Sequence, residues 1–456
     1  MRIWLWLGAA AIVACGNSNA NHLADGHVDG AIDHGDSGSN DSGATTVTVT
    51  FTNAPTVPAD FAFVVGFEDG SGAWQTAPAP TGGVYTLSIA SASYGVVYTC
   101  IGNGGGSGSA IGLDRDVVMG NFAVAENPAL ALTVPARCTD TTPALAPVAG
   151  SFANQPATGS IAMFLAGKQF TVVPNAAGLP GYATNVLPGT YDLVAVHSPP
   201  PTAGVTVPDL VLVQRGLAVG SAGVAGNALD FSKAKAVQDF NLNVSLGSGA
   251  QIATSTDLVA SSTTATLVTE TAAGGKPQTL DAIGLSASQA LATDLYAIRV
   301  AASAGSGNVV QAASFVTIPT ADTFVAPPVV GAVLSTVPTT APYPELALSW
   351  SAYANATGYE AVAKQGCAVG NAPTVCLTWT MAMSATVAGA SPALQMPDLT
   401  SLAGWDTRLQ LVTGAPVAGE VAAETSTAGT ADFPLSGLPP AGTKRTTATT
   451  TFSVTP

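Results

Sequence analysis

Charged side chains are scarce in this sequence, and positive ones are the scarcest. Asp, Glu, Lys and Arg make up 9% of the 456 residues, with 13 Lys plus Arg against 28 Asp plus Glu and a formal net charge of −15 at pH 7. Proteins that bind nucleic acid or anionic membrane surfaces by electrostatics need clustered positive charge. The composition therefore argues against both as electrostatic partners, and we expect no nucleic-acid partner.

The body of the chain also lacks a long apolar run. After the N-terminus, Gly, Pro or polar residues interrupt every apolar segment before it reaches the roughly 20 residues of a membrane-spanning helix. Low charge does not indicate disorder here, because 47% of the residues are hydrophobic. A chain of this length should divide into three or four domains of about 100 residues.

Sequence signatures of catalysis and metal binding are missing as well. There is no CxxC pair and no G-x-S-x-G elbow, and the glycine-rich stretch 102–112 lacks the Gly-Lys-Ser/Thr of a phosphate loop. The folded body holds one histidine, His197, which we interpret as a structural residue at the end of a strand. We expect no cofactor, no metal and no catalytic residues.

Four acids are the remaining candidates for chemistry, and they lie in two short groups: Glu68, Asp69, Asp114 and Asp116. A pair of carboxylates across a cleft is what a glycosidase needs, and a cluster of them can hold calcium. Their turn and loop context favours the simpler interpretation of solvated hairpin ends.

The N-terminus carries the most specific motif of the sequence. Arg2 precedes an apolar run over residues 3–14, and Ile12-Val13-Ala14 is followed by Cys15. This pattern resembles the lipobox of bacterial lipoproteins. The resemblance implies that residues 1–14 are a signal peptide, that Cys15 is lipidated, and that acyl chains anchor the protein in a membrane. Gly16, in place of Asp, favours the outer membrane. The alternative is an ordinary secreted protein with a chance cysteine.

Residues 15–44 are predicted to be a disordered acidic tether. The stretch has no aromatic residue and is rich in Gly, Ser, Asn and Asp, a composition that cannot bury a core. His22, His27 and His34 lie among its aspartates, so a weak divalent-metal site is the alternative, although the spacing matches no known metal loop.

The cysteine count agrees with lipidation. Of five cysteines, Cys15 would be consumed, which leaves two pairs that are each close in sequence. In an oxidising compartment we predict the disulfides Cys100–Cys138 and Cys367–Cys376, with links between the pairs as the alternative.

Short β-branched runs separated by turn residues predict an all-β fold of several tandem antiparallel β-sandwich domains. The clearest example is the alternating TTVTVTF at 45–51. We expect units at 45–138, 139–232, 233–327 and 328–456. One short helix or helical turn is expected at 286–294.

Two of these units carry family resemblances. Leu187-Pro188-Gly189-Thr190-Tyr191 looks like the entry to the last strands of transthyretin-like or carboxypeptidase-regulatory-like sandwiches. In the last unit, Trp350 and Tyr359 hold the places of the tryptophan and tyrosine that pack together in fibronectin type III domains. Both resemblances imply a β-sandwich.

The most consistent function is a non-enzymatic, lipid-anchored envelope protein with a structural, adhesive or binding role at the outer membrane. Its partners would be the membrane, through the lipid, and a protein or polysaccharide ligand. One alternative is a carbohydrate-binding accessory protein, for which Trp74 beside a polar turn is the candidate ring, against a simpler role in the core. The second alternative is a hydrolase with an unrecognised site.

Overall fold

The computed structural model confirms the all-β fold of several antiparallel sandwiches. It describes residues 44–103, 113–135, 138, 144–166, 168–172, 181–200, 207–245, 251–260, 263–273, 278–303, 308–325, 327–366, 376–433 and 438–456. The expected signal peptide and Cys15, and all of the expected tether except its last residue, lie outside these ranges.

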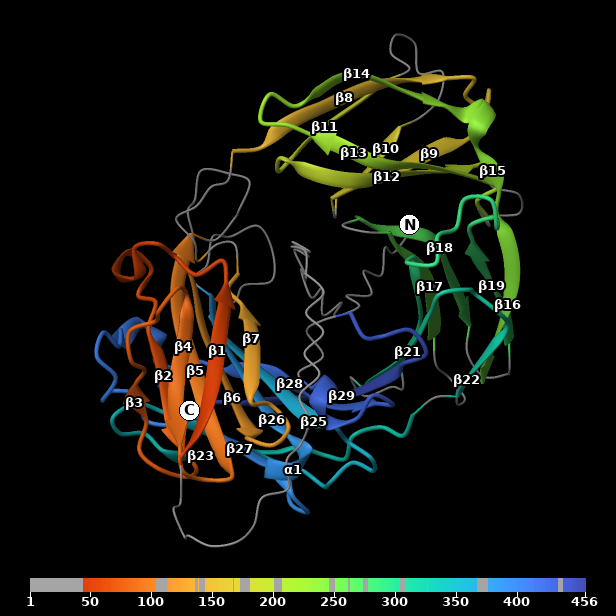
Figure 1. Ribbon diagram of the computed structural model, residues 1–456. Helices are drawn as coiled ribbons and strands as arrows, with labels where there is room; N and C mark the ends of the chain where they lie inside the picture. The colour runs from red at the N-terminus through yellow and green to blue at the C-terminus, as the bar shows by residue number, and fades with distance from the viewer. Residues whose placement is uncertain are drawn as a thin grey trace, which may run out of the picture.

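One twelve-stranded sheet runs through the first, third and fourth predicted units (Figure 1). Neighbouring strands are antiparallel except for one parallel pair, β26 and β6. In spatial order the strands are β18 (Thr263–Ala273), β17 (Gln251–Ala260), β20 (Leu295–Ser303), β21 (Val309–Val316), β29 (Lys444–Val454), β28 (Val417–Ser426), β25 (Gly358–Gln365), β26 (Cys376–Ser384), β6 (Leu113–Ala123), β5 (Ser93–Asn103), β2 (Val65–Asp69) and β3 (Gln75–Thr76).

Two seams join the units within this sheet. The first is the parallel pairing of β6 with β26, from Asp114–Cys376 to Asn121–Met383. The second is the antiparallel pairing of β21 with β29. The first, third and fourth units therefore share one sheet, a connection that the sequence did not reveal.

Three-stranded sheets complete the sandwiches on both faces of this large sheet. Those on one face share its main core, and the third packs with β2, β5 and β6 on the other face. They are β19 (Gln278–Gly284), β16 (Gln238–Ser245) and β22 (Asp322–Val325); β23 (Leu334–Thr339), β24 (Glu345–Ser349) and β27 (Ala393–Gln395); and, on the opposite face, β4 (Val84–Ile89), β1 (Thr45–Thr52) and β7 (Ala129–Thr133).

The alternation predicted for residues 45–51 is present in β1. Val47, Val49 and Phe51 are buried, and the threonines between them are exposed or half-buried. Because successive strand side chains point to opposite faces, this pattern directs one face of β1 to the core.

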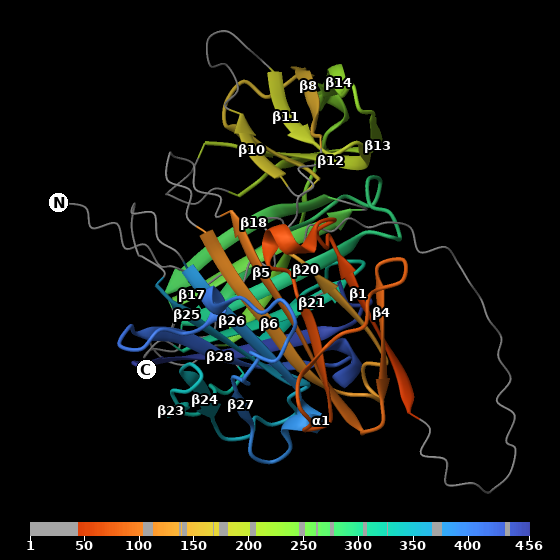
Figure 2. The same cartoon turned by 90° about the vertical axis from the view of Figure 1, so that its left-hand side faces the viewer.

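The second predicted unit is a separate sandwich of two sheets beside the β18 edge of the large sheet (Figure 2). Tyr191, in the motif that suggested such a sandwich, donates its hydroxyl hydrogen to the Leu187 carbonyl at 2.8 Å. The strands are β10 (Lys168–Val172), β9 (Ser160–Leu165), β12 (Gly189–Ser198), β13 (Leu210–Val219) and β15 (Lys235–Ala236) in one sheet, and β11 (Gly181–Val186), β8 (Ala146–Ala153) and β14 (Val224–Asp230) in the other.

Helical structure is confined to single turns. No helix in the described ranges is long and apolar enough to cross a bilayer. The short helix or helical turn expected at 286–294 takes the form of two turns: the N–H groups of Gln289 and Ala290 both donate to the Ser286 carbonyl, and the N–H of Asp294 donates to the Leu291 carbonyl. The helical turns are η1 (Pro58–Phe61), η3 (Phe231–Lys233), α1 (Ala385–Ala388), η4 (Thr407–Leu409) and η5 (Thr430–Asp432).

The last unit has the aromatic contact that its sequence suggested. The rings of Trp350 and Tyr359 meet edge to face with centroids 5.5 Å apart, and both residues are buried. Such pairs stabilise a sandwich core beyond the area that they bury.

Candidate functional site

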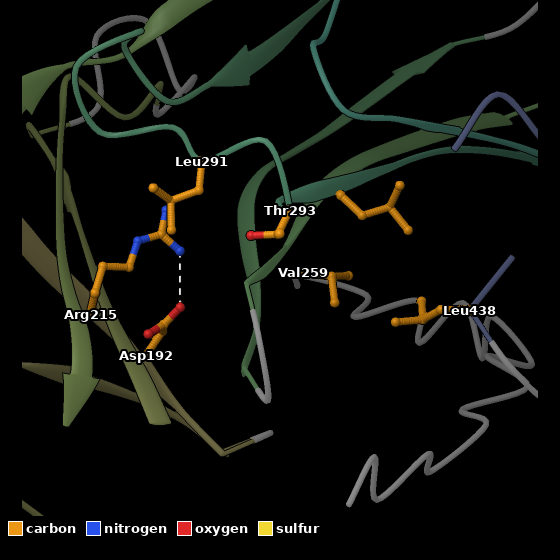
Figure 3. A pocket seen from close by; sticks show the side chains of 7 residues that line it. Asp192, Arg215, Val259, Leu291, Thr293 and Leu438 are labelled. Atoms are coloured by element: carbon orange, nitrogen blue, oxygen red, sulfur yellow. Dashed lines mark hydrogen bonds and ion pairs between the residues drawn. The ribbon is translucent and has the colours of Figure 1, made fainter. Parts of the chain in front are cut away.

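A hollow of about 560 Å³ opens where the second predicted unit meets the third (Figure 3). A concave site at such a boundary, with apolar walls and a few polar groups, is a usual place for a ligand to bind. The residues that line it come from the β12–β13 hairpin, β17, the 286–294 turns, the start of β20 and the segment before β29: Asp192, Arg215, Val259, Leu291, Thr293, Leu295 and Leu438.

A β-bulge aims Arg215 at this junction. The register of β12 against β13 shifts between Tyr191 and Leu193, so Arg215 and Gly216 together face Asp192. Gly216 has φ of 66°, a left-handed conformation that glycine adopts without strain. Its backbone N–H donates to an Asp192 carboxylate oxygen at 2.9 Å. The bulge thus places an arginine and an aspartate side by side at the end of the sandwich.

The Arg215 guanidinium is fully engaged by groups from both units. Its Nη1 donates to Asp192 Oδ2 at 2.9 Å and to Asp294 Oδ1 at 2.9 Å. Its Nη2 donates to Asp294 Oδ2 at 2.7 Å and to the Gln289 carbonyl at 3.0 Å. These four bonds use all four terminal hydrogens, and Nε is buried without a partner among the described residues. Arg215 therefore has no terminal N–H left for an anion in the hollow, and its one unused donor, Nε–H, is buried.

The polar end of the hollow carries one excess negative charge, because two carboxylates face one guanidinium. Burial lowers the pKa of Arg215, but its hydrogen bonds to Asp294 and Asp192 and their charges outweigh burial and raise this pKa overall. The Asp192 side chain is 9% exposed and that of Asp294 is 1% exposed, so Asp192 is the carboxylate within reach. The Thr293 hydroxyl points toward the Arg215–Asp192 pair (Figure 3). This end of the hollow therefore offers acceptors.

The remaining walls are aliphatic: Val259, Leu291, Leu295 and Leu438. Leu291 is 49% exposed and Leu438 is 53% exposed, which is unusual for leucine. Apolar side chains left in water at the rim of a concave site are typical of binding surfaces.

Packing beneath the hollow holds the two units together. The Thr263 hydroxyl on β18 donates to the Asp192 carbonyl at 2.5 Å and accepts from the Ala166 N–H at 3.2 Å. Around these bonds, side chains of β9, β12 and β13 share one apolar cluster with side chains of β17, β18, β19 and β20. The hollow therefore lies where the second and third units are held together by a shared apolar core and hydrogen bonds.

His197 has the structural contacts expected of a strand-end residue. Its Nδ1 lies 2.5 Å from Asp209 Oδ1, and its Nε2 lies 2.8 Å from the Thr158 carbonyl oxygen. The residue is 3% exposed. Because both ring nitrogens are bonded to protein groups, neither is available to activate a serine.

The four acids considered for glycosidase or calcium chemistry are not brought together. Glu68 and Asp69 end β2, Asp114 and Asp116 lie near the start of β6, and β5 runs between the two strands. Along β5, Glu68 pairs with Gly95 and Asp116 pairs with Cys100, five residues or about 17 Å away. The arrangement fits neither use.

Glu68 and Asp69 nevertheless have distinct environments. The Asp69 carboxylate accepts the backbone N–H groups of Ala90 and Ser91 at 2.9 and 2.8 Å, and these bonds lower its pKa. Burial raises the pKa of Glu68 to about 7. Asp69 therefore stabilises this hairpin end through its hydrogen bonds, whereas burial makes ionisation of Glu68 unfavourable.

The predicted disulfide Cys100–Cys138 is present, with Cα atoms 5.8 Å apart and both residues fully buried. Asp116 Oδ2 lies 3.9 Å from Cys138 Sγ. Within the described ranges, these three residues form the one group of metal-ligating side chains whose atoms lie within 4.8 Å of one another. Since the two sulfurs are bonded to each other, they are not free as thiolate ligands, and the group consists of a disulfide with a carboxylate beside it. Cys376 is also disulfide-bonded, but its predicted partner Cys367 lies outside the described residues.

Trp74 lies in the core, which was the favoured interpretation of its sequence position, and is not an exposed sugar platform. The residue is 8% exposed and packs in the main core with Val97 and Leu402. Its carbonyl also accepts a hydrogen bond from Ser401 at 3.2 Å.

Sequence reasoning missed Asp192, Arg215 and Asp294. A signal was available, because LVLVQRGLAV places a rare positive charge and a glycine inside an apolar strand. A glycine within a strand pattern suggests a bulge.

Comparisons with known proteins place the chain in no family. No family model matches it, and no curated protein matches. Among solved structures, the chicken CNTN1 FN1–FN3 domains cover 58% of this chain and 85% of their own, at 10% identity and a TM-score of 0.14. The Bacillus anthracis TIE protein covers 84% of this chain, which spans 63% of that protein, at 7% identity and a TM-score of 0.14. Likenesses this distant carry no argument about function.

Proposed function

We propose that this chain is a non-enzymatic, lipid-anchored protein of the bacterial outer membrane, with a structural or binding role. The anchor is proposed from the sequence motif that ends at Cys15. The binding role is proposed from the junction hollow, whose polar end and apolar rim are held in place by Arg215.

The observation that carries this proposal is the continuity of the body. Twelve strands from three units form one sheet, and the second unit is joined to that sheet through a shared core and the ion pair between Arg215 and the buried Asp294. Large packed interfaces restrict relative motion of domains. A rigid body of this kind suits the display of a fixed surface.

The anchor is tested by Cys15→Ser. We expect this variant to lose labelling by radioactive palmitate and to leave the membrane fraction, because the thioether site is gone. A variant that stays in the membrane with unchanged mass would refute the anchor. Protease treatment of intact cells then separates display on the cell surface from a periplasmic position.

The alternatives have less support. A carbohydrate-binding role rested on Trp74, which is buried. The residues considered for a hydrolase were His197 and the acids Glu68, Asp69, Asp114 and Asp116, and they do not come together in one catalytic arrangement.

A further inference from the structure

We propose that the junction hollow binds a lysine side chain of a partner protein. This inference rests on the proposed binding role and names the chemistry of the partner. It follows from the hydrogen-bond inventory of the hollow, from its walls and from its charge.

The hydrogen bonds already made in the hollow determine the charge that a ligand should carry. An arginine in a pocket usually suggests an anion, but every terminal hydrogen of Arg215 is already donated to Asp192, Asp294 or Gln289. What faces the hollow instead is the Asp192 carboxylate, with one excess negative charge behind it, and the Thr293 hydroxyl. An anion would meet the excess negative charge and no free terminal N–H of Arg215, and the Thr293 hydroxyl would be its one side-chain donor among the residues that line the hollow. A group with N–H donors and a positive charge would form charge-assisted hydrogen bonds.

The walls set the shape of the ligand. Besides Asp192, Arg215 and Thr293, the lining is aliphatic and includes Val259, Leu291 and Leu438. A lysine has an aliphatic stem that packs on such side chains, and an ammonium group at its end that seeks acceptors. A compact, hydrated cation would leave these walls in water.

Size and charge favour a polypeptide as the source of the lysine. The hollow of about 560 Å³ is larger than one side chain requires, and it can therefore admit the flanking backbone. The net charge of −15 attracts basic surfaces from a distance.

The test is calorimetric titration of the full-length protein in detergent with three probes. Nα-acetyl-lysine methylamide should bind about tenfold more tightly than the norleucine analogue, which has the same stem length and no ammonium group. It should also bind more tightly than hexylammonium, which lacks the backbone. Equal affinity for lysine and norleucine probes, or no heat with the lysine probe at millimolar concentration, would overturn the proposal. Equal affinity for hexylammonium would also overturn it, in favour of a free amine.

A lysine introduced into the hollow itself should compete with the lysine probe, and this provides a test by substitution. Leu291→Lys places an ammonium group at the rim, where it can reach Asp192, and should abolish binding of the lysine probe. Leu334→Lys changes another exposed leucine, 65% exposed on β23, and should bind as the native protein does. If both variants bind equally, the hollow is not the site. Neither result depends on the anchor, because palmitate labelling of Cys15 tests that separately.

Discussion

Removal of the Arg215 side chain should cost more stability than removal of any exposed arginine. Arg215→Met leaves Asp192 and Asp294 buried without their counter-charge, and breaking a buried pair in this way costs about 3–5 kcal/mol. Denaturant unfolding followed by circular dichroism measures the loss.

Arg408→Met is the matched control for this change. Arg408 pairs with Asp406, but its side chain is 50% exposed, so the change should cost less than about 1 kcal/mol. Equal losses in the two variants would show that the junction ion pairs do not hold the units together.

Glu68 should make stability depend on pH. Burial raises its folded-state pKa from 4.5 to about 7, so its contribution is fully present below the ordinary pKa and is lost as the pH rises through 7. Its carboxyl group lies beside Asn121 Oδ1 over Gly95, and that amide oxygen is buried without a partner among the described residues. Glu68→Gln supplies a neutral donor.

We expect Glu68→Gln to be more stable than the native protein at pH 8, by on the order of 1 kcal/mol after solvent screening is allowed for, and to match it at pH 4. Unfolding curves at the two pH values give the comparison. A constant difference across this range would show that folding does not change the pKa of Glu68.

Among the elements, β5 depends on the disulfide that ends the first unit. Cys100–Cys138 closes a loop of 38 residues, which contributes about 4 kcal/mol in the chain-entropy model. Cys100→Ala with Cys138→Ala should lower the free energy of unfolding by roughly that amount. Non-reducing peptide mapping of the native protein should find this link, a second one between residues 367 and 376, and no free thiol. A link between residues 138 and 367 would contradict this pairing.

For the whole molecule, the shared sheet predicts coupled unfolding of three units. Met119 on β6 is 3% exposed and faces Met381 of β26 across the parallel seam. Met119→Ala should cost about 2–5 kcal/mol and should speed hydrogen exchange in β25 and β26 as well as in β5. Met163→Ala, at a buried site on β9 in the second unit, should affect that unit alone. If Met119→Ala loosened only the first unit, the sheet would not be one cooperative body.

Local sequence patterns predicted the strands of this fold. They could not predict which strands from distant parts of the chain pair with each other. The alternation in β1, the Cys100–Cys138 spacing and the Trp350–Tyr359 pair are all features of one segment or one unit. The β6–β26 seam joins residues with no local signal for each other, since parallel pairing leaves no turn between them.

The junction site could not be predicted for the same reason. Asp192 and Arg215 share a hairpin, but Asp294 belongs to another unit 79 residues after Arg215.

The parallel seam also has a consequence for how the chain is made. During synthesis β6 emerges long before its partner β26, and the side chain of Arg115 cannot donate to the carbonyl of Arg408 until that residue, 293 positions later, has been made. Until then β6 is an open strand edge that can pair with other chains. Contacts of such long range also form slowly. The newly made protein therefore passes through a stage in which its first unit is prone to aggregate, and a chaperone that shields strand edges would act at that stage.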